Sequence, residues 1–197
     1  MICAMILAAG ESRRMGAPKL LLPLGEKTII ETVVDETLRS KADQTLVVLG
    51  AEREKIERKI ANRPAMVVAN PRYQEGMLSS IQAGFKALPR ETEAIVICLG
   101  DQPFIPSSVM DKLIEAYQNT RRGIILPVYK KKRGHPTLID IKYRQEVKKL
   151  SPDIGLRALV YDHPQDVLEV EVDTPLILKD IDKPEDYMRE LKEKEED

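Results

Sequence analysis

The sequence has few of the residues that build disulfide frameworks and zinc sites. Its only two cysteines, Cys3 and Cys98, lie inside apolar runs, where a thiol usually behaves as a small buried hydrophobe. Neither a disulfide framework nor a cysteine-rich metal site is therefore predicted. His135 is one of only two histidines, and no second ligand lies at metal spacing from it, so no zinc site is expected either.

The chain also lacks net charge and any long apolar run. Its 31 Lys and Arg residues almost balance 32 Asp and Glu residues, so no overall field would recruit nucleic acid or an anionic membrane. The apolar stretch 2–9 has no basic segment before it and is much shorter than the ~20 residues of a membrane span. We expect a cytoplasmic protein that binds neither nucleic acid nor membrane, and whose phosphate binding depends on locally placed charge.

What is present is a regular alternation of short apolar runs with longer amphipathic stretches. This alternation is typical of an α/β fold with a parallel sheet and crossover helices. A length of 197 residues suits one domain, 1–197, and no repeat or Ser-, Gly- or Pro-rich linker divides the chain. The predicted strands are 2–8, 44–50, 65–69, 94–99, 124–129 with 137–139, and 167–173. The predicted helices are 28–40, 51–62, 77–88, 108–119, 143–150, 155–161 and 184–193.

Two helix starts carry a capping pattern, in which a Ser or Asp is followed three residues later by an acidic residue. The first pattern is Ser108 with Asp111, and the second is Asp182 with Glu185. We therefore predict capping boxes at these two positions.

The loop after the first strand offers a place for phosphates. Ligands of an open parallel sheet bind beyond the carboxyl ends of its strands. Here Ala8, Ala9 and Gly10 would let backbone amides approach an anion, and Arg14 and Lys19 would neutralise its charge. The glycine spacing matches neither a dinucleotide fingerprint nor a Walker A loop, which argues against a dehydrogenase and a P-loop ATPase. The alternative is a solvated turn with incidental basic residues.

Two aspartates follow apolar segments and could bind a metal ion. Asp101 follows the strand 94–99 after Gly100, at a position where a carboxylate can hold Mg²⁺ while phosphates and water complete its shell. Asp101 could equally be a turn former, and Asp182 could be the N-cap of the last helix. These alternatives stay open from the residues alone.

Two further segments could face a ligand. The segment 76–80, from Gly76 to Ser80, opens a helix whose free amides and hydroxyls suit a nucleotide, although it could be an ordinary cap. Gly84 in the same helix is interpreted as a packing residue. The basic run 130–133, before His135, is typical of a hairpin tip and would attract a phosphorylated acceptor if it folded over the site.

Several of these strings together resemble a known family. Residues 7–25 (LAAGESRRMGAPKLLLPLG) resemble the signature of nucleotidyltransferases that activate molybdopterin and isoprenoid precursors, and are most similar to the molybdenum cofactor cytidylyltransferase family. Further matches, in the same order along almost the whole chain, are 75–84 (EGMLSSIQAG), 99–104 (LGDQPF), 133–136 (RGHP), 153–157 (DIGLR) and 180–187 (DIDKPEDY). One departure is Ser151-Pro-Asp153, which stands where the family commonly has Gly-Asp and so keeps Asp153.

The resemblance implies a Rossmann-like three-layer α/β/α sandwich with a mostly parallel sheet. It implies a Mg²⁺ site at Asp101 and Asp182, with catalytic roles for Arg14, Lys19 and Asp101. The nucleotide-binding residues that it implies are Leu7, Ala8, Ala9, Gly10, Arg14, Lys19, Gly76 and Ser80. The acceptor-side residues that it implies are His135, Asp153 and Arg157. In this group Leu-Ala-Ala-Gly accompanies CTP and Leu-Ala-Gly-Gly accompanies GTP, so Ala9 favours CTP.

The reaction implied is transfer of CMP from CTP to the phosphate of a phosphorylated pterin acceptor, molybdopterin or its molybdenum form. A phosphate with a second pKa of about 6 is largely dianionic near neutrality, which agrees with the lack of a general-base motif. A molybdoenzyme or cofactor-insertion protein is a further partner compatible with this activity. The alternatives are guanylyl transfer, cytidylyl transfer to a sugar- or polyol-phosphate, and a nucleotide-binding regulatory subunit without turnover.

Overall fold

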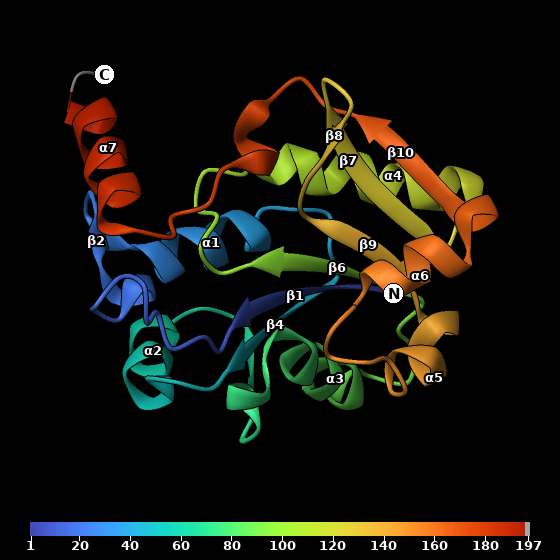
Figure 1. Ribbon diagram of the computed structural model, residues 1–197, viewed down its shortest axis with the longest axis horizontal. Coiled ribbons are helices and arrows are strands. Elements are labelled where there is room, and N and C mark those ends of the chain that lie inside the picture. Colours follow the sequence, from blue (N-terminus) through green and yellow to red (C-terminus); the bar gives the residue numbers. More distant parts are fainter. Residues whose placement is uncertain (196–197) are drawn as a thin grey trace.

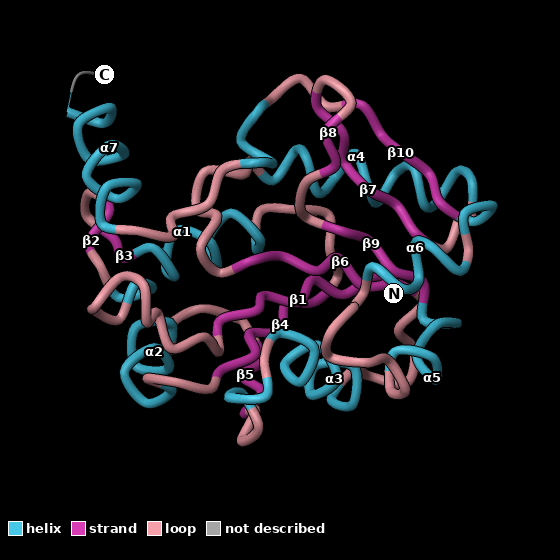
Figure 2. Tube along the Cα trace, in the orientation of Figure 1, coloured by secondary structure: helices cyan, strands magenta, loops and turns pink. Residues whose placement is uncertain are grey.

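The computed structural model describes the backbone of residues 1–195 and the side chains of residues 1–191. Its centre is an eight-stranded sheet with the order β10-β7-β9-β6-β1-β4-β5, and β8 pairs with β7 outside this path (Figure 2). The strands of this sheet are β1 (Ile2–Ala8), β4 (Gln44–Leu49), β5 (Met66–Ala69), β6 (Ala94–Leu99), β7 (Ile124–Tyr129), β8 (Lys132–Arg133), β9 (Thr137–Asp140) and β10 (Val167–Glu171). A separate small hairpin joins β2 (Pro23–Leu24) to β3 (Lys27–Thr28).

Helices cover both faces of the sheet, with α1 and α4 on one side and α3 and α5 on the other (Figure 1). The helices are α1 (Ile29–Leu38), α2 (Arg53–Ile60), α3 (Met77–Ala87), α4 (Ser107–Thr120), α5 (Arg144–Val147), α6 (Arg157–Asp162) and α7 (Pro184–Glu195). The expected three-layer α/β/α sandwich is confirmed. Within the described residues, no helix combines the length and the apolar character that crossing a bilayer requires.

The central strands are buried on both faces, which explains their continuous apolar sequences. In β1, Ile6 belongs to the cluster beneath α1, α2 and α4, whereas Met5 belongs to the cluster that includes α3, α5 and α6. Val47 and Val48 of β4 divide between the two clusters in the same way. Because neighbouring residues of a strand point to opposite faces, each apolar strand contributes to both cores.

Strand directions place one end of the sheet under the predicted site. β1 pairs in parallel with β4 and β6, and β4 pairs in parallel with β5, so the carboxyl ends of these four strands meet at one edge. β9 is the exception within the main path, because it runs antiparallel to both β6 and β7. The residues that precede β9 therefore lie at the same edge as the residues that follow β6.

The predicted capping box at Ser108 is wrong. α4 begins at Ser107 after Pro106, and no side chain caps its first turn. The amide of Ser107 instead donates to Glu36 of α1 at 3.1 Å, and the Asp111 carboxylate accepts from the backbone of Lys41 at 2.7 Å. A carboxylate distant in the sequence thus satisfies the helix start, and the local pattern does not show it.

The predicted partner in the second capping box is also wrong. α7 begins at Pro184, and the Asp186 carboxylate, rather than that of Glu185, accepts from the amides of Asp182 and Lys183 at 3.2 and 3.0 Å. The Asp182 carboxylate instead contacts Lys19 and Arg14.

The predicted helix 143–150 is shorter than expected. It forms a 3₁₀ turn, Ile141–Tyr143, followed by α5, which ends at Val147. The basic run 130–133 is the expected hairpin tip, with Lys130 and Lys131 at positive φ between β7 and β8.

Candidate active site

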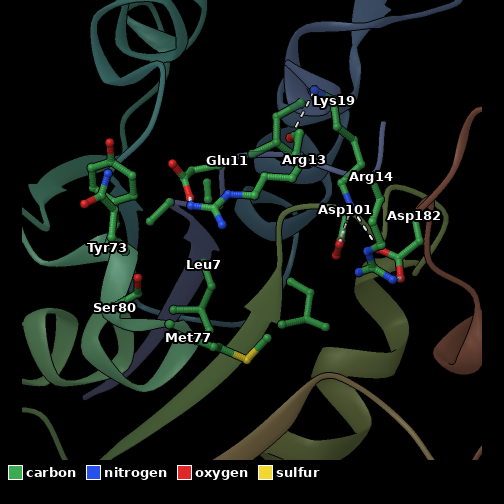
Figure 3. Close-up of a pocket in the computed structure, with 18 residues that line it drawn as sticks. Leu7, Glu11, Arg13, Arg14, Lys19, Tyr73, Met77, Ser80, Asp101 and Asp182 are labelled. Atoms are coloured by element: carbon green, nitrogen blue, oxygen red, sulfur yellow. Dashed lines mark hydrogen bonds and ion pairs between the residues drawn. The ribbon is translucent and has the colours of Figure 1, made fainter. Parts of the chain in front are cut away.

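A cavity of about 420 Å³ opens at the carboxyl edge of the sheet (Figure 3). All ten residues predicted to bind nucleotide or metal line this cavity: Leu7, Ala8, Ala9, Gly10, Arg14, Lys19, Gly76, Ser80, Asp101 and Asp182. They come from the end of β1 and its loop, the start of α3, the turn after β6 and the segment before α7. The fold thus brings together side chains that lie as far as 175 positions apart, from Leu7 to Asp182.

Backbone contacts fix the start of the loop after β1. The amide of Gly100 donates to the carbonyl of Leu7 at 3.0 Å, and the amide of Ala51 donates to that of Ala9 at 3.1 Å. A Cβ on Gly100 would lie 2.9 Å from the Leu7 oxygen, so only glycine allows this approach. The loop therefore leaves β1 between the ends of β4 and β6.

The far end of the same loop is held by a turn and by burial. The amide of Met15 donates to the carbonyl of Ser12 at 2.9 Å, and the amide of Lys19 donates to the Ser12 hydroxyl at 3.2 Å. Met15 and Leu20 are buried in the core beneath α1. These contacts fix the backbone from which the Lys19 side chain extends into the cavity.

Lys19 joins the two aspartates. Its ammonium donates to Asp101 Oδ2 at 2.7 Å and to Asp182 Oδ1 at 3.1 Å, while Arg14 contacts Asp182 Oδ2 at 2.8 Å. The Lys19 side chain is 11% exposed, and the two carboxylates are about a quarter exposed. The backbone supports this geometry, because the amide of Ile181 donates to the Asp101 carbonyl at 3.1 Å. Two carboxylates thus converge on one cationic point.

The negative charge at this point extends to Asp180. Burial raises the pKa of the Asp180 carboxyl above its usual range, and the charges of Asp182 and Asp101 raise it further. Neighbouring carboxylates that repel one another in this way are stabilised by a cation between them.

The donor set is suited to a hard divalent ion. Carboxylate oxygens are the ligands that Mg²⁺ and Mn²⁺ prefer, and the Lys19 ammonium occupies the point where a cation would meet both. Among the described residues no three or more His, Cys, Asp or Glu side chains form a metal-binding group. Asp101 and Asp182 would therefore supply part of the shell, and phosphate oxygens and water the rest.

The other end of the cavity is lined by the start of α3 and by the 3₁₀ helix Tyr73–Glu75. Figure 3 shows Tyr73 and Ser80 at this end, away from Lys19, Asp101 and Asp182. Ser80 is only 4% exposed. The cavity therefore has a charged end and a less charged end, which suits a triphosphate joined to a base.

A family model for the MobA-like NTP transferase domain matches residues 4–177 of the sequence. The chain belongs to the MobA-like NTP transferase family. It is accordingly a nucleotidyltransferase, and its fold is that of the nucleotide-diphospho-sugar transferases.

Two curated relatives match almost the whole chain. The molybdenum cofactor cytidylyltransferase of Escherichia coli is 28% identical over 190 residues, which cover 95% of this chain and 94% of the relative. Nicotine blue oxidoreductase of Paenarthrobacter nicotinovorans is 28% identical over 199 residues, with 96% of each chain covered. Because these two relatives are equally identical but differ in name, overall identity does not choose an activity for this chain.

Among solved structures, Rv0371c of Mycobacterium tuberculosis superposes with a TM-score of 0.87, at 28% identity and 97% coverage of each chain. A manganese complex of the same protein superposes with a TM-score of 0.82. A protein with this fold therefore binds manganese.

The three predicted acceptor-side residues lie outside the cavity lining. His135 precedes β9, and its backbone amide donates to the carbonyl of Ile177 at 3.1 Å. Burial lowers the pKa of its imidazole; the charge of Asp101 acts to raise it, and that of Arg157 acts to lower it. His135 therefore lies within electrostatic reach of the charged end of the cavity. Asp153 and Arg157 are exposed, on and just after the turn before α6.

Sequence reasoning missed several residues of the cavity wall. Glu11 and Arg13 form an ion pair of 2.7 Å on the loop after β1, and both line the cavity. Tyr73 and Met77 line its less charged end. The sequence feature that could have indicated Tyr73 is its position as an aromatic residue just before the Gly76 motif. The packing prediction for Gly84 is confirmed, because a Cβ there would lie 2.4 Å from the Met5 sulfur.

Proposed function

We propose that the chain transfers a cytidylyl group from CTP to the terminal phosphate of a molybdopterin-type acceptor, with release of pyrophosphate. The observation that carries this proposal is the junction of Lys19 with Asp101 and Asp182 at one end of a cavity that starts at the Ala8-Ala9-Gly10 loop. Such a junction provides positive charge for a triphosphate and two carboxylates for a hard metal ion.

The residues divide the work by position. Lys19 and Arg14 orient the triphosphate and stabilise the charge that develops on the departing pyrophosphate. Asp101 and Asp182 would hold Mg²⁺, which when bound supplies Lewis acidity to the phosphate oxygens. No general base is needed, since the acceptor phosphate is already largely dianionic near neutrality.

The preference for CTP rests on Ala9. Ala9 lines the cavity and is 5% exposed, and a methyl group at this position would take up room that glycine would leave to a larger purine. The likeness to the Escherichia coli cytidylyltransferase supports the same base and a pterin acceptor.

The test is turnover of α-labelled CTP and GTP with purified molybdopterin, followed by pyrophosphate release. Faster turnover with CTP supports the proposal, and equal or faster turnover with GTP contradicts the choice of base. Turnover only with a sugar- or polyol-phosphate would contradict the acceptor.

The metal role is tested by kcat against Mg²⁺ concentration for Asp101→Asn, Asp182→Asn and the double variant. Each single variant should need more Mg²⁺, and the double variant should be scarcely worse than the poorer single one, because both carboxylates act on one ion. Asp173→Asn is the matched control, since Asp173 is 93% exposed and pairs with Lys112 away from the cavity. A normal Mg²⁺ dependence in both single variants would leave the aspartates with structural roles only.

A further inference from the structure

A buried amide side chain lies beneath the less charged end of the cavity. Asn70 follows β5 and is 3% exposed, and its backbone N–H donates to the carbonyl of Leu49 at 2.7 Å. Its side-chain Nδ2 donates to Ser79 Oγ at 2.9 Å and to Ser80 Oγ at 3.0 Å. Asn70 therefore connects the end of a central strand to the first turn of α3.

The orientation of the Asn70 amide is fixed by a backbone group. The amide of Arg72 donates to Asn70 Oδ1 at 3.0 Å. A backbone N–H can only donate, so the oxygen of Asn70 must face it and the NH₂ group must face the serines. Both hydrogens of that NH₂ group are then used, one on each serine.

The two serine hydroxyls differ in whether their protons have an acceptor within the protein. Ser79 has acceptors for its proton in the carbonyls of Arg72 and Gly76, both at 2.8 Å. Ser80 accepts from Asn70, but among the described residues no acceptor receives the proton of its hydroxyl. Since Ser80 lines the cavity, this proton is available to an acceptor on whatever the cavity binds.

We propose that Asn70 is a positioning residue for base recognition: it makes the Ser80 hydroxyl a donor toward the cavity and so selects a base that presents an acceptor there. Cytosine presents two neighbouring acceptors, N3 and O2, on its Watson–Crick edge. Guanine presents the donors N1–H and N2–H₂ on the corresponding part of its edge, and a donor facing a donor leaves both unsatisfied. This inference rests on the proposed use of CTP, and it adds to the contribution of Ala9 a second one from a residue that does not line the cavity.

The decisive variant is Asn70→Asp, which keeps size and shape but inverts polarity. One carboxylate oxygen can still accept from the Arg72 amide, whereas the other can only accept from the serines. The Ser80 proton then turns toward the carboxylate, and the Ser80 lone pairs face the cavity. At pH 8, we expect the Kd for a non-hydrolysable α,β-methylene CTP analogue to rise about tenfold or more, by loss of one hydrogen bond.

Two further variants separate base recognition from a structural role. Ser80→Ala should weaken binding of the CTP analogue to a similar degree. Adding Asn70→Asp to the Ser80→Ala variant should change the Kd little, because both substitutions act through one hydroxyl. Ser79→Ala is the matched control: it breaks the neighbouring bond of the same amide but leaves the Ser80 proton in place. Its melting temperature should fall, while its ratio of CTP to GTP analogue affinity should stay within about threefold of the wild type.

Asn70→Ala covers the case in which the buried carboxylate prevents folding. It frees the Ser80 hydroxyl to rotate, so the ratio of CTP to GTP analogue affinity should fall toward one without reversing. The proposal is overturned if folded Asn70 variants keep the wild-type ratio, or if Ser79→Ala changes that ratio as much as they do. A wild type that binds the GTP analogue as tightly as the CTP analogue would instead contradict the proposed use of CTP, and this inference with it.

Discussion

Replacing Lys19 by methionine should have opposite effects on metal binding and on turnover. Methionine keeps the long, mostly buried stem but removes the ammonium that Asp101 and Asp182 share. The contacted oxygens lie 2.7 and 3.1 Å from one nitrogen, so they are less than about 6 Å apart. At an effective dielectric constant of about 20, two unit charges at ~5 Å repel each other by ~3 kcal/mol. Arg14, which stays on Asp182, and the partial exposure of both carboxylates reduce this value.

Part of that repulsion becomes affinity for a cation. We expect nucleotide-free Lys19→Met protein to bind Mn²⁺ about tenfold or more tightly than the wild type, as a gain of ~1.4 kcal/mol would give. Turnover should fall by ~10²–10³, the usual loss when one stabilising donor is removed from a transition state. Added Mn²⁺ should also raise the melting temperature of the variant more than that of the wild type.

The assay is titration of Mn²⁺ into nucleotide-free protein, with the free ion followed by its electron paramagnetic resonance signal. Lys27→Met is the control, because Lys27 pairs with Asp35 at 2.6 Å outside the cavity and its loss should leave Mn²⁺ affinity unchanged. Equal or weaker Mn²⁺ binding by Lys19→Met would refute the idea that lysine and metal share the same carboxylates.

Three further predictions concern stability and reactivity. The Arg63 guanidinium holds the pKa of the Asp35 carboxyl below its usual range. The ionised Asp35 therefore contributes stability that is complete above about pH 3.9, the pKa of an unperturbed Asp, and that is lost as the pH falls through the lower pKa of the folded protein. Asp35→Asn should therefore cost ~1 kcal/mol at pH 7, and the difference in melting temperature from wild type should narrow below about pH 4. Burial raises the pKa of the Cys98 thiol to about 12, so iodoacetamide at pH 8 should leave Cys98 unmodified until the protein unfolds; labelling of native protein, seen by mass spectrometry, would contradict this. A Cβ on Gly134 would lie 2.3 Å from the carbonyl oxygen of Ile177, so Gly134→Ala should lower the free energy of unfolding by about 1–3 kcal/mol. An unchanged melting temperature would show that the backbone adapts.

The strands were predictable because buried parallel strands have continuous apolar sequences. β1 has its predicted bounds, and β4 and β5 each differ by one residue at one end. Helix starts were less predictable, since the amide of Ser107 finds its acceptor in Glu36, 71 positions away. Sequence spacing carries no information about such a contact.

The site was predictable to the extent that it follows from strand ends. The rule that ligands bind beyond the carboxyl ends of parallel strands placed the loop after β1 and Asp101 at one edge. It could not show that a single ammonium joins Asp101 to Asp182, which lies 81 positions further along the chain. Nor could it show the role of Asn70, whose sequence context is that of an ordinary turn and whose importance comes only from three hydrogen bonds in the folded chain.

The reversed strand β9 separates the two halves of the proposed site by the kind of connection that carries them. The half proposed to bind the nucleotide lies on loops between parallel strands and helices, and a change in their length would disturb a crossover. The half around His135 lies beside the β7–β8 hairpin, whose tip is the two residues Lys130 and Lys131. A hairpin can be lengthened by adding residue pairs at its tip while the register of its base is kept. Evolution, or an engineer, can thus remodel the proposed acceptor half of the site without altering the half proposed to hold the nucleotide.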